Sequence, residues 1–444
     1  MSTSSTRAFI DTMSDRHVGR DRQRLTATVT DITVERQRAL LVALDDGSDP
    51  AGVPISLDEI ARLVDTAGSV AVERAVQKRP KPDPATYIGK GKADELASIG
   101  RALDIDLVVV DGELTPVQQR NLQEIFGVDV VDRVALILDI FAQHASSRAG
   151  RAQVELAMLH YRLPRLRGKG VEMSRLGGGI GTRGPGETKL ETDRRRVLRR
   201  ISQLDGELEE LETVRATQRK ARRRSEIPSV ALVGYTNAGK SSLLNRLTDA
   251  EVLVEDRLFS TLDATVRRLN LPTGREMVIS DTVGFLRDLP HDLVDAFHST
   301  LEETIGSDLL VHVVDASADD PERQIAAVRS TLQEIEAHEI PELMVLNKID
   351  RASPVAVERL LGRHSGAVPV SATKGAGIDT LLEALDRAIS AEAIDVEVLI
   401  PFDRGDLVDL IHRVGEIVSE SHEAGGTRVK ARIPSRHTTA FAGL

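Results

Sequence analysis

The stretch that decides the fold reads Val233-Gly234-Tyr235-Thr236-Asn237-Ala238-Gly239-Lys240-Ser241-Ser242. The apolar run Val230–Val233 before it is typical of a strand, and Leu243–Leu247 after it is typical of a helix. The glycines at the two ends of a GxxxxGKS loop let successive backbone N–H groups face an anion at the helix N-terminus. The spacing therefore predicts a phosphate-binding loop between a strand and a helix.

The residue types of this loop assign candidate roles. Lys240 is expected to reach the β- and γ-phosphates of a nucleotide, and the Ser241 hydroxyl is expected to bind Mg²⁺. The backbone of the loop should hold the phosphates. The candidate nucleotide-binding residues in the loop are Gly234, Asn237, Ala238, Gly239, Lys240, Ser241 and Ser242.

Three further motifs follow in a fixed order, each after a strand-like run. They are Asp281-Thr282-Val283-Gly284, Asn347-Lys348-Ile349-Asp350 and Ser371-Ala372-Thr373. The Asp350 carboxylate would accept hydrogen bonds from N1 and N2 of guanine, a donor arrangement that adenine lacks. The segment 371–373 is suited to presenting a backbone N–H to guanine O6. Four motifs in this order predict a GTPase.

The position after the Asp281–Gly284 motif bears on the rate of hydrolysis. Gly284 is expected to offer its N–H to the γ-phosphate, and many small GTPases follow this glycine with a glutamine that orients water. Here the next residue is Phe285, which has no hydrogen-bonding atom. We therefore expect slow intrinsic hydrolysis and a partner that supplies the missing group. Asn237 lies where some GTPases with an apolar residue at this position hold K⁺; the alternative is a loop-capping asparagine.

Composition limits the other functions that the chain could have. A chain of 444 residues suggests two to four domains. It contains no cysteine, which excludes disulfides, thiolate metal sites and cysteine nucleophiles. No signal peptide or membrane span is visible in the sequence, so we expect a cytoplasmic protein, monomeric when free.

Charge is unevenly distributed along the chain. The formal net charge is −11, yet residues 146–200 hold fourteen basic and only five acidic residues. An acidic protein with one arginine-rich segment is expected to direct that segment at phosphates. The alternative is a solvated helix face.

Periodicity predicts the domain layout. Strands alternate with helices over 26–145, which indicates a parallel α/β subdomain after a flexible leader, 1–25. A helical hairpin over 146–226 should follow, because Val197, Ile201, Leu204, Leu208 and Leu211 form a seam with coiled-coil spacing. The GTPase domain is expected over 227–391 and a small α+β domain over 392–444. The predicted fold class is thus α/β, with a P-loop GTPase domain between these two neighbours.

Glycine dominates the predicted tip of the hairpin, 177–186. The tip contains a formal GxGxxG dinucleotide fingerprint, but no strand precedes it and Pro185 spoils the helix that should follow. A flexible linker is one reading. The preferred one is a tip without bulky side chains that enters an RNA-lined space, where arginines meet phosphates. The candidate RNA-binding residues are Arg175, Gly178, Gly179, Arg183 and Lys189.

With these features the chain resembles the HflX family of translation-associated GTPases over about residues 35–444. The strings that carry the resemblance are Tyr87-Ile88-Gly89-Lys90-Gly91-Lys92, the segment Arg175–Thr188, Leu258-Phe259-Ser260-Thr261-Leu262-Asp263 and Asp281–Phe285. The resemblance implies binding to the large ribosomal subunit and its rRNA, with the hairpin tip approaching the peptidyl transferase centre. It also implies splitting or rescue of stalled or idle ribosomes, particularly after stress.

The resemblance extends the list of site residues. It implies that Thr261 completes the Mg²⁺ shell with Ser241 when GTP is bound, so Lys240, Thr261 and Gly284 are the catalytic candidates. Members of the family are reported to accept ATP, and a site for ATP would have to lie in the N-terminal domain. The alternative function is a nucleotide-gated RNA-binding switch in ribosome assembly, in which hydrolysis only resets binding.

Overall fold

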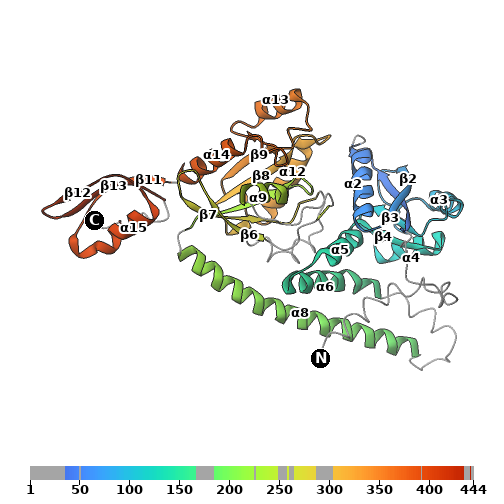
Figure 1. The fold of residues 1–444 in the computed structure, drawn as a ribbon. Helices are drawn as coiled ribbons and strands as arrows, with labels where there is room; N and C mark the ends of the chain where they lie inside the picture. Colours follow the sequence, from blue (N-terminus) through green and yellow to red (C-terminus); the bar gives the residue numbers. More distant parts are fainter. Residues whose placement is uncertain are drawn as a thin grey trace, which may run out of the picture. The chain divides into compact units, whose positions relative to one another are not determined.

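The computed structural model describes residues 36–49, 52–166, 185–224, 227–248, 258–259, 265–286, 304–391, 393–434 and 441. The sequence-based expectations for the leader 1–25, for Thr261 and for Arg175, Gly178, Gly179 and Arg183 lie outside these residues. The elements described below belong to one unit, Arg38–Leu444. They are coloured along the chain in Figure 1.

Residues 38–144 form the predicted parallel α/β layer. Its elements are β1 (Arg38–Asp45), α2 (Gly52–Thr66), β2 (Val70–Lys78), α3 (Lys90–Ala102), β3 (Leu107–Asp111), α4 (Pro116–Phe126), β4 (Asp129–Asp132) and α5 (Arg133–His144). The strands pair in parallel in the order β2-β1-β3-β4. Successive residues of β1 face opposite sides, because Leu40 belongs to the core under α3 and α4 whereas Leu41 belongs to the core under α2 and α5.

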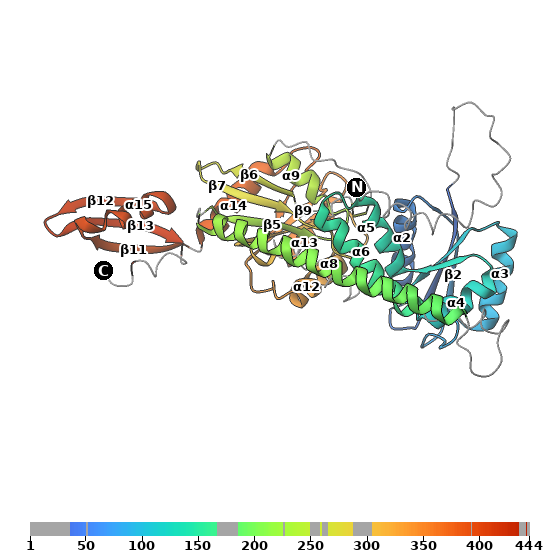
Figure 2. The ribbon, with the colours of Figure 1, turned by 90° about the horizontal axis from the view of Figure 1, so that it is seen from below.

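Two helices form the predicted hairpin. α6 (Arg148–Arg162) is followed by the short helix η2 (Pro164–Leu166), and α8 spans Pro185–Arg224. The two helices lie side by side in Figures 1 and 2. They are antiparallel, because Arg148 at the start of α6 pairs with Glu207 whereas Glu155, further along, pairs with Arg200.

The seam predicted on α8 holds the hairpin together. Val197, Ile201 and Leu204 are buried against Ala152 and Leu159 of α6. The arginines beside the seam are largely engaged within the protein: Arg148 with Glu207, Arg195 with Glu191, Arg196 with Asp193 and Arg200 with Glu155. Carboxylates of the two helices thus match part of the charge of this basic segment, and its role toward phosphates stays a prediction.

The P-loop domain is a six-stranded sheet. Its elements are β5 (Ser229–Gly234), α9 (Lys240–Thr248), β6 (Thr265–Asn270), β7 (Glu276–Asp281), β8 (Leu309–Asp315), α12 (Pro321–Glu334), β9 (Glu342–Asn347), α13 (Pro354–Arg363), β10 (Val368–Pro369) and α14 (Ile378–Ala391). The order is β10-β9-β8-β5-β7-β6, with only β6 antiparallel to its neighbour. β10 ends at Pro369, because Ser371 enters a turn that its own Oγ closes by accepting from the Lys374 N–H at 3.1 Å.

The C-terminal segment is a small antiparallel sheet with one helix. It consists of β11 (Ala393–Ile400), η3 (Phe402–Arg404), α15 (Gly405–Val414), β12 (Glu416–Glu423) and β13 (Gly426–Pro434). β13 lies in the middle, and Leu407 and Ile411 of α15 pack on Val429 and Ile433. This agrees with the predicted α+β class. Within the described ranges, none of the helices is long and apolar enough to cross a membrane.

The hairpin packing generates a stability prediction. Leu204 is 1% exposed at the centre of the seam, so Leu204→Ala should lower the free energy of opening the hairpin by about 2–5 kcal/mol. Hydrogen exchange of the α6 and α8 amides measures this opening. Leu198→Ala is the matched control, because Leu198 lies on the same helix but is 42% exposed, and it should change protection by less than about 0.5 kcal/mol. Equal effects of the two substitutions would contradict the proposed seam.

Candidate nucleotide site

The four motifs meet at one edge of the P-loop sheet. β5, β7, β8, β9 and β10 run parallel, so their carboxyl ends share an edge. The phosphate-binding loop follows β5, Asp281 ends β7, Asn347 ends β9 and Ser371 follows β10. In open parallel sheets ligands bind outside the carboxyl ends of the strands. Residues separated by more than a hundred positions thus line one site.

The loop itself depends on backbone conformations that its glycines permit. Gly239 has a φ of +92°, and a Cβ there would lie 2.3 Å from the Asn347 side-chain nitrogen. A Cβ on Gly234 would lie 2.3 Å from the Val313 carbonyl oxygen. Asn237 has a φ of 59°, a left-handed conformation that asparagine tolerates better than most residues. Substituting either glycine would therefore displace the loop from Asn347 or from β8.

Lys240 is buried at the centre of the loop. Its Nζ donates to the carbonyl oxygens of Gly234 at 3.1 Å and Tyr235 at 3.0 Å. Burial lowers the pKa of Lys240 to about 8, while the nearby Asp281 carboxylate acts in the opposite direction. The ammonium group is thus held beneath the loop by backbone carbonyls, in a position where an anion would stabilise its charge.

Hydroxyl and carboxylate oxygens lie together beside Lys240. The Ser241 Oγ donates to an Asp281 carboxylate oxygen at 2.6 Å. Oxygen atoms of this kind are the ligands that Mg²⁺ prefers, so the pair fits a magnesium ion. Gly284 passes close to the loop, because a Cβ there would lie 2.8 Å from the Thr236 Cα and 3.1 Å from the Lys240 Nζ. Its backbone can therefore approach a phosphate held by the loop.

The Asn347-Lys348-Ile349-Asp350 motif connects the phosphate-binding loop to the 371–373 segment. The Asn347 side chain donates to the Ala238 carbonyl at 2.9 Å and accepts from the Ala372 N–H at 3.1 Å. The Lys348 Nζ donates to the Asn237 carbonyl at 2.6 Å and pairs with Asp315 at 2.7 Å. These bonds tie the phosphate-binding loop to the segment 371–373, so the distance between the two is fixed.

Asp350 is held in its ionised form at the outer end of the edge. It accepts a hydrogen bond from the Ser371 Oγ at 2.6 Å, and this bond is the main cause that lowers its pKa. Arg246 donates to the carbonyls of Ala372 at 2.9 Å and Thr373 at 2.8 Å. Ser371 thus orients the Asp350 carboxylate, and Arg246 orients the segment that follows β10.

Phe285 does not face the site. Its side chain is 1% exposed and lies in the same apolar cluster as Leu57 and Ile60 of α2. Its backbone is tied to the loop, since the Thr236 N–H donates to the Phe285 carbonyl at 2.8 Å and the Phe285 N–H donates to Gly234 at 3.1 Å. The residue therefore serves packing, in agreement with the expectation that it supplies no hydrogen bond to water.

Sequence reasoning missed the contacts between this edge and the N-terminal domain. The Tyr235 hydroxyl donates to Glu59 of α2, and the Leu258 N–H donates to the Thr66 Oγ1 at 3.3 Å. Phe259 packs edge-on against Phe141 of α5, with ring centroids 4.5 Å apart. No motif marks these partners, because they lie in another domain, far from the loop in the sequence. Asp315 was also missed, although its place at the end of β8 could have indicated it.

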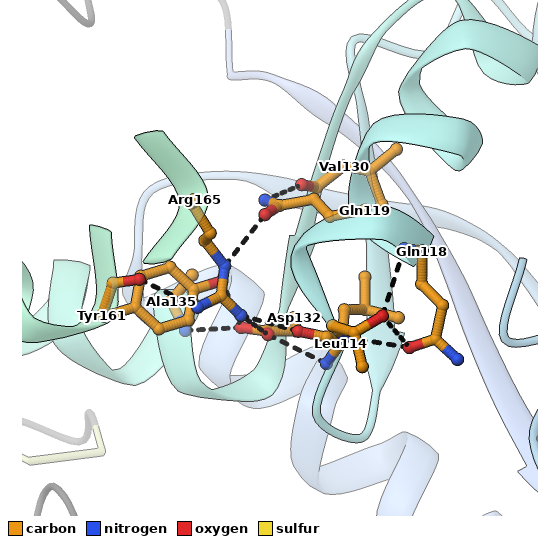
Figure 3. Close-up of polar contacts among 9 residues, drawn as sticks. Leu114, Gln118, Gln119, Val130, Asp132, Ala135, Tyr161 and Arg165 are labelled. Carbon is orange, nitrogen blue, oxygen red and sulfur yellow. Dashed lines mark hydrogen bonds and ion pairs between the residues drawn. The ribbon is translucent and has the colours of Figure 1, made fainter. Parts of the chain in front are cut away.

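A second polar cluster lies at the carboxyl edge of the N-terminal sheet (Figure 3). Arg165 of η2 donates to Gln119 at 3.0 Å, to the Tyr161 carbonyl at 2.8 Å, to the Leu114 carbonyl at 2.7 Å and to Asp132 at 3.2 Å. Its guanidinium also stacks 3.5 Å from the centre of the Tyr161 ring, and burial raises the pKa of that phenol. Arg165 therefore anchors the end of α6 through contacts within the N-terminal domain.

Comparison with family models agrees with this order of domains. Four family models match consecutive parts of the chain: GTP-binding GTPase N-terminal (55–142), GTP-binding GTPase Middle Region (144–222), 50S ribosome-binding GTPase (229–348) and HflX C-terminal domain (356–442). Among solved structures, a GTP-binding protein from Sulfolobus solfataricus in complex with GDP is 26% identical, covers 79% of this chain and 98% of its own, and has a TM-score of 0.42.

Curated relatives match nearly the whole chain. The GTPase HflX of Caldanaerobacter subterraneus is 46% identical over 90% of this chain and 91% of its own length. The GTPase HflX of Escherichia coli is 43% identical over 85% of this chain and 89% of its own. With the phosphate-binding loop, the Asn347–Asp350 motif and the HflX C-terminal domain in one chain, the protein belongs to the HflX family of GTPases.

Proposed function

We propose that this GTPase binds the large ribosomal subunit, splits or rescues stalled or idle ribosomes, and hydrolyses GTP faster when it is bound there. The observation that carries the proposal is the match of residues 229–348 to a family described as 50S ribosome-binding GTPases. The long hairpin of α6 and α8 supports it, because the hairpin leads to the glycine- and arginine-containing segment 167–184. The tip residues Arg175, Gly178, Gly179 and Arg183, with Lys189 of α8, are proposed to meet rRNA.

In this proposal the carboxyl edge of the sheet holds the nucleotide. Lys240 and the backbone N–H groups of the loop bind the phosphates, and the Gly284 N–H faces the γ-phosphate. The Ser241 hydroxyl, the Asp281 carboxylate and Thr261 would hold Mg²⁺, which neutralises charge on the phosphates when it is bound. Asn237 is the candidate for a K⁺ ion.

The other end of the edge is proposed to bind the base. Asp350 would accept from N1 and N2 of guanine, and the Ala372 region would offer a backbone N–H to O6. Asn347 and Lys348 would keep the two halves of the site in register through the bonds to Ala238 and Asn237. The site then discriminates guanine from adenine by donor and acceptor pattern rather than by size.

The buried lysine predicts a pH dependence of nucleotide binding. Lys240 loses its proton near pH 8 in the free protein, whereas bound phosphates favour the charged form. The affinity for GDP should therefore not depend on pH below about pH 8, and it should fall by about tenfold per pH unit above it. Calorimetry at pH 9 in two buffers of different ionisation enthalpy should detect the uptake of one proton.

The control for this measurement is Lys240→Arg, since a guanidinium stays charged throughout this pH range and should abolish the proton uptake. A wild-type protein that binds GDP at pH 9 without taking up a proton would contradict the proposed contact between Lys240 and the phosphates.

The Asp350 carboxylate predicts the base specificity. Asp350→Asn should bind GDP about tenfold to a hundredfold more weakly and prefer xanthosine diphosphate, because a charged acceptor that is worth ~1.5–3 kcal/mol becomes an amide. Competition binding measures both affinities. Asp379→Asn removes the same charge from an exposed position of α14 and should change neither. Unchanged GDP affinity in Asp350→Asn would show that this residue does not read the base.

The proposed binding to the ribosome predicts faster GTP hydrolysis and the splitting of 70S ribosomes into subunits. Large subunits should raise the rate of GTP hydrolysis by at least about tenfold, since groups supplied by a partner can contribute 10³ or more. In a sucrose gradient, 70S ribosomes incubated with protein and GTP or a non-hydrolysable analogue should shift to subunits, and with GDP they should not.

A pair of arginine substitutions, one at the hairpin tip and one on α13, tests whether the tip contacts the ribosome. Arg183→Ala should lose stimulation, more so as salt is added, while Arg359→Ala, which removes an exposed charge from α13, should not. Stimulation by large subunits without a change in the gradient would favour an RNA-binding switch in ribosome assembly. Equal hydrolysis with and without subunits would remove the ribosome as activator.

A further inference from the structure

One buried hydroxyl of the phosphate-binding loop has no hydrogen-bond partner among the residues that the structure describes. The Thr236 side chain is 6% exposed, and its Oγ1 is buried and unpaired. A buried polar atom in this state costs free energy, so such atoms are uncommon in folded proteins and require an explanation. Lys240, which is proposed to bind the phosphates, is equally buried at 6% exposure. Burial therefore does not separate Thr236 from the nucleotide site.

Buried hydroxyls of the neighbouring strand are engaged within the protein. The Thr282 Oγ1 donates to the Leu232 carbonyl at 2.6 Å, and the Ser280 Oγ donates to the Val230 carbonyl at 3.3 Å. These two hydroxyls tie β7 and the residue after it to β5 and thus serve the fold. The Thr236 hydroxyl makes no such bond, so the fold does not account for it.

The backbone that carries Thr236 is fixed on both sides. Its N–H donates to the Phe285 carbonyl at 2.8 Å, and the Phe285 N–H donates to the Gly234 carbonyl at 3.1 Å. Tyr235 and Phe285 also form an isolated parallel β-bridge. The next residue, Asn237, has a φ of 59°. Only rotation about χ1, between staggered positions, is then needed to redirect the Thr236 hydroxyl.

Thr236 lies beside the groups that are proposed to bind the γ-phosphate. A Cβ on Gly284 would lie 2.8 Å from both the Cα and the Cγ2 of Thr236, and 3.1 Å from the Lys240 Nζ. The Thr236 side chain, the Lys240 ammonium group and the Gly284 backbone are therefore neighbours. A γ-phosphate bound by Lys240 and by the Gly284 N–H would lie next to Thr236.

Hydrolysis of GTP needs a group that positions the attacking water. The water oxygen bonds to the γ-phosphorus, the bond from this phosphorus to the bridging oxygen breaks, and GDP leaves with that oxygen. One proton of the water ends on the inorganic phosphate. In many small GTPases a glutamine orients this water, whereas Phe285 is buried in an apolar cluster. A hydroxyl can take the same role, because it accepts one hydrogen bond while it donates another.

We propose that the Thr236 hydroxyl accepts a hydrogen bond from the attacking water, donates one to a γ-phosphate oxygen, and so holds the water for attack. The proposal rests on the proposed binding of the γ-phosphate by Lys240 and Gly284. Thr236 ends the reaction with the same number of protons as it began. GDP has no γ-phosphate, so the hydroxyl acts on hydrolysis and not on the binding of GDP.

Thr236→Val in the full-length chain tests the hydroxyl, because valine has nearly the same shape without the oxygen. In single-turnover hydrolysis at saturating GTP without ribosomes, the rate constant should fall about tenfold or more, while the affinity for GDP stays within about twofold. The melting temperature should not fall, because the replaced hydroxyl has no hydrogen bond to lose. Thr236→Ser keeps the hydroxyl and should recover most of the rate.

The matched control is Thr331→Val on α12. Thr331 is also buried, at 5% exposure, but its Oγ1 donates to the Ala327 carbonyl at 3.2 Å within the helix. This variant undergoes the same chemical change outside the nucleotide site, so it should hydrolyse GTP at the wild-type rate.

Three outcomes would overturn the proposal while leaving the nucleotide site in place. They are a wild-type rate in Thr236→Val, equal losses of rate in Thr236→Val and Thr236→Ser, and a joint loss of rate, GDP affinity and melting temperature in Thr236→Val, which would make the residue structural. The affinity of Lys240→Ala for GTP tests the site itself. Unchanged affinity would refute the proposed contact of Lys240 with the phosphates, and the role of Thr236 with it.

Discussion

The edge-on packing of Phe259 against Phe141 joins the nucleotide-binding edge to the N-terminal domain. Phe259 has a φ of 58°, which is uncommon for a bulky residue and costs of the order of 1 kcal/mol or more. Burial of the ring stabilises the contact by ~1.5–3 kcal/mol, enough to offset that cost. The segment that leads to Thr261 is thus held by α5. If the segment before Thr261 responds to the nucleotide as proposed, its movement would also disturb the packing against the N-terminal domain.

The same cluster gathers residues from three parts of the nucleotide-binding edge. Tyr235 comes from the phosphate-binding loop, Phe259 from the segment before Thr261, and Phe285 follows the Asp281–Gly284 motif. All three pack with apolar residues of α2 and α5. The N-terminal domain therefore contacts the phosphate-binding loop, the segment 258–259 and the residue after Gly284. It also explains how an apolar residue at position 285 can be useful: it contributes packing where other GTPases place a hydrogen-bonding side chain.

Much of the fold could be predicted from local signals. The loop with Lys240, the motifs around Asp281 and Asp350, and the α8 seam are encoded in short stretches whose spacing reflects strands, helices and turns. The contact of Glu59 with Tyr235 could not be predicted, because it joins helices and loops of different domains and no periodicity reports it. The ion pairs of Arg165 and Arg200 could not be predicted either, because a sequence shows that arginines cluster but not which carboxylates fold back onto them.

The central claim is that the nucleotide and the N-terminal domain act on one another through α2. Hydrogen exchange of the full-length protein, with GDP and with a non-hydrolysable GTP analogue, tests this most directly. The account predicts that protection of the α2 amides differs between the two nucleotides, while protection of α3, which packs on the opposite face of the same sheet, does not. Identical exchange of α2 in both states would contradict the account, since a γ-phosphate that left α2 unaffected could not be sensed through it.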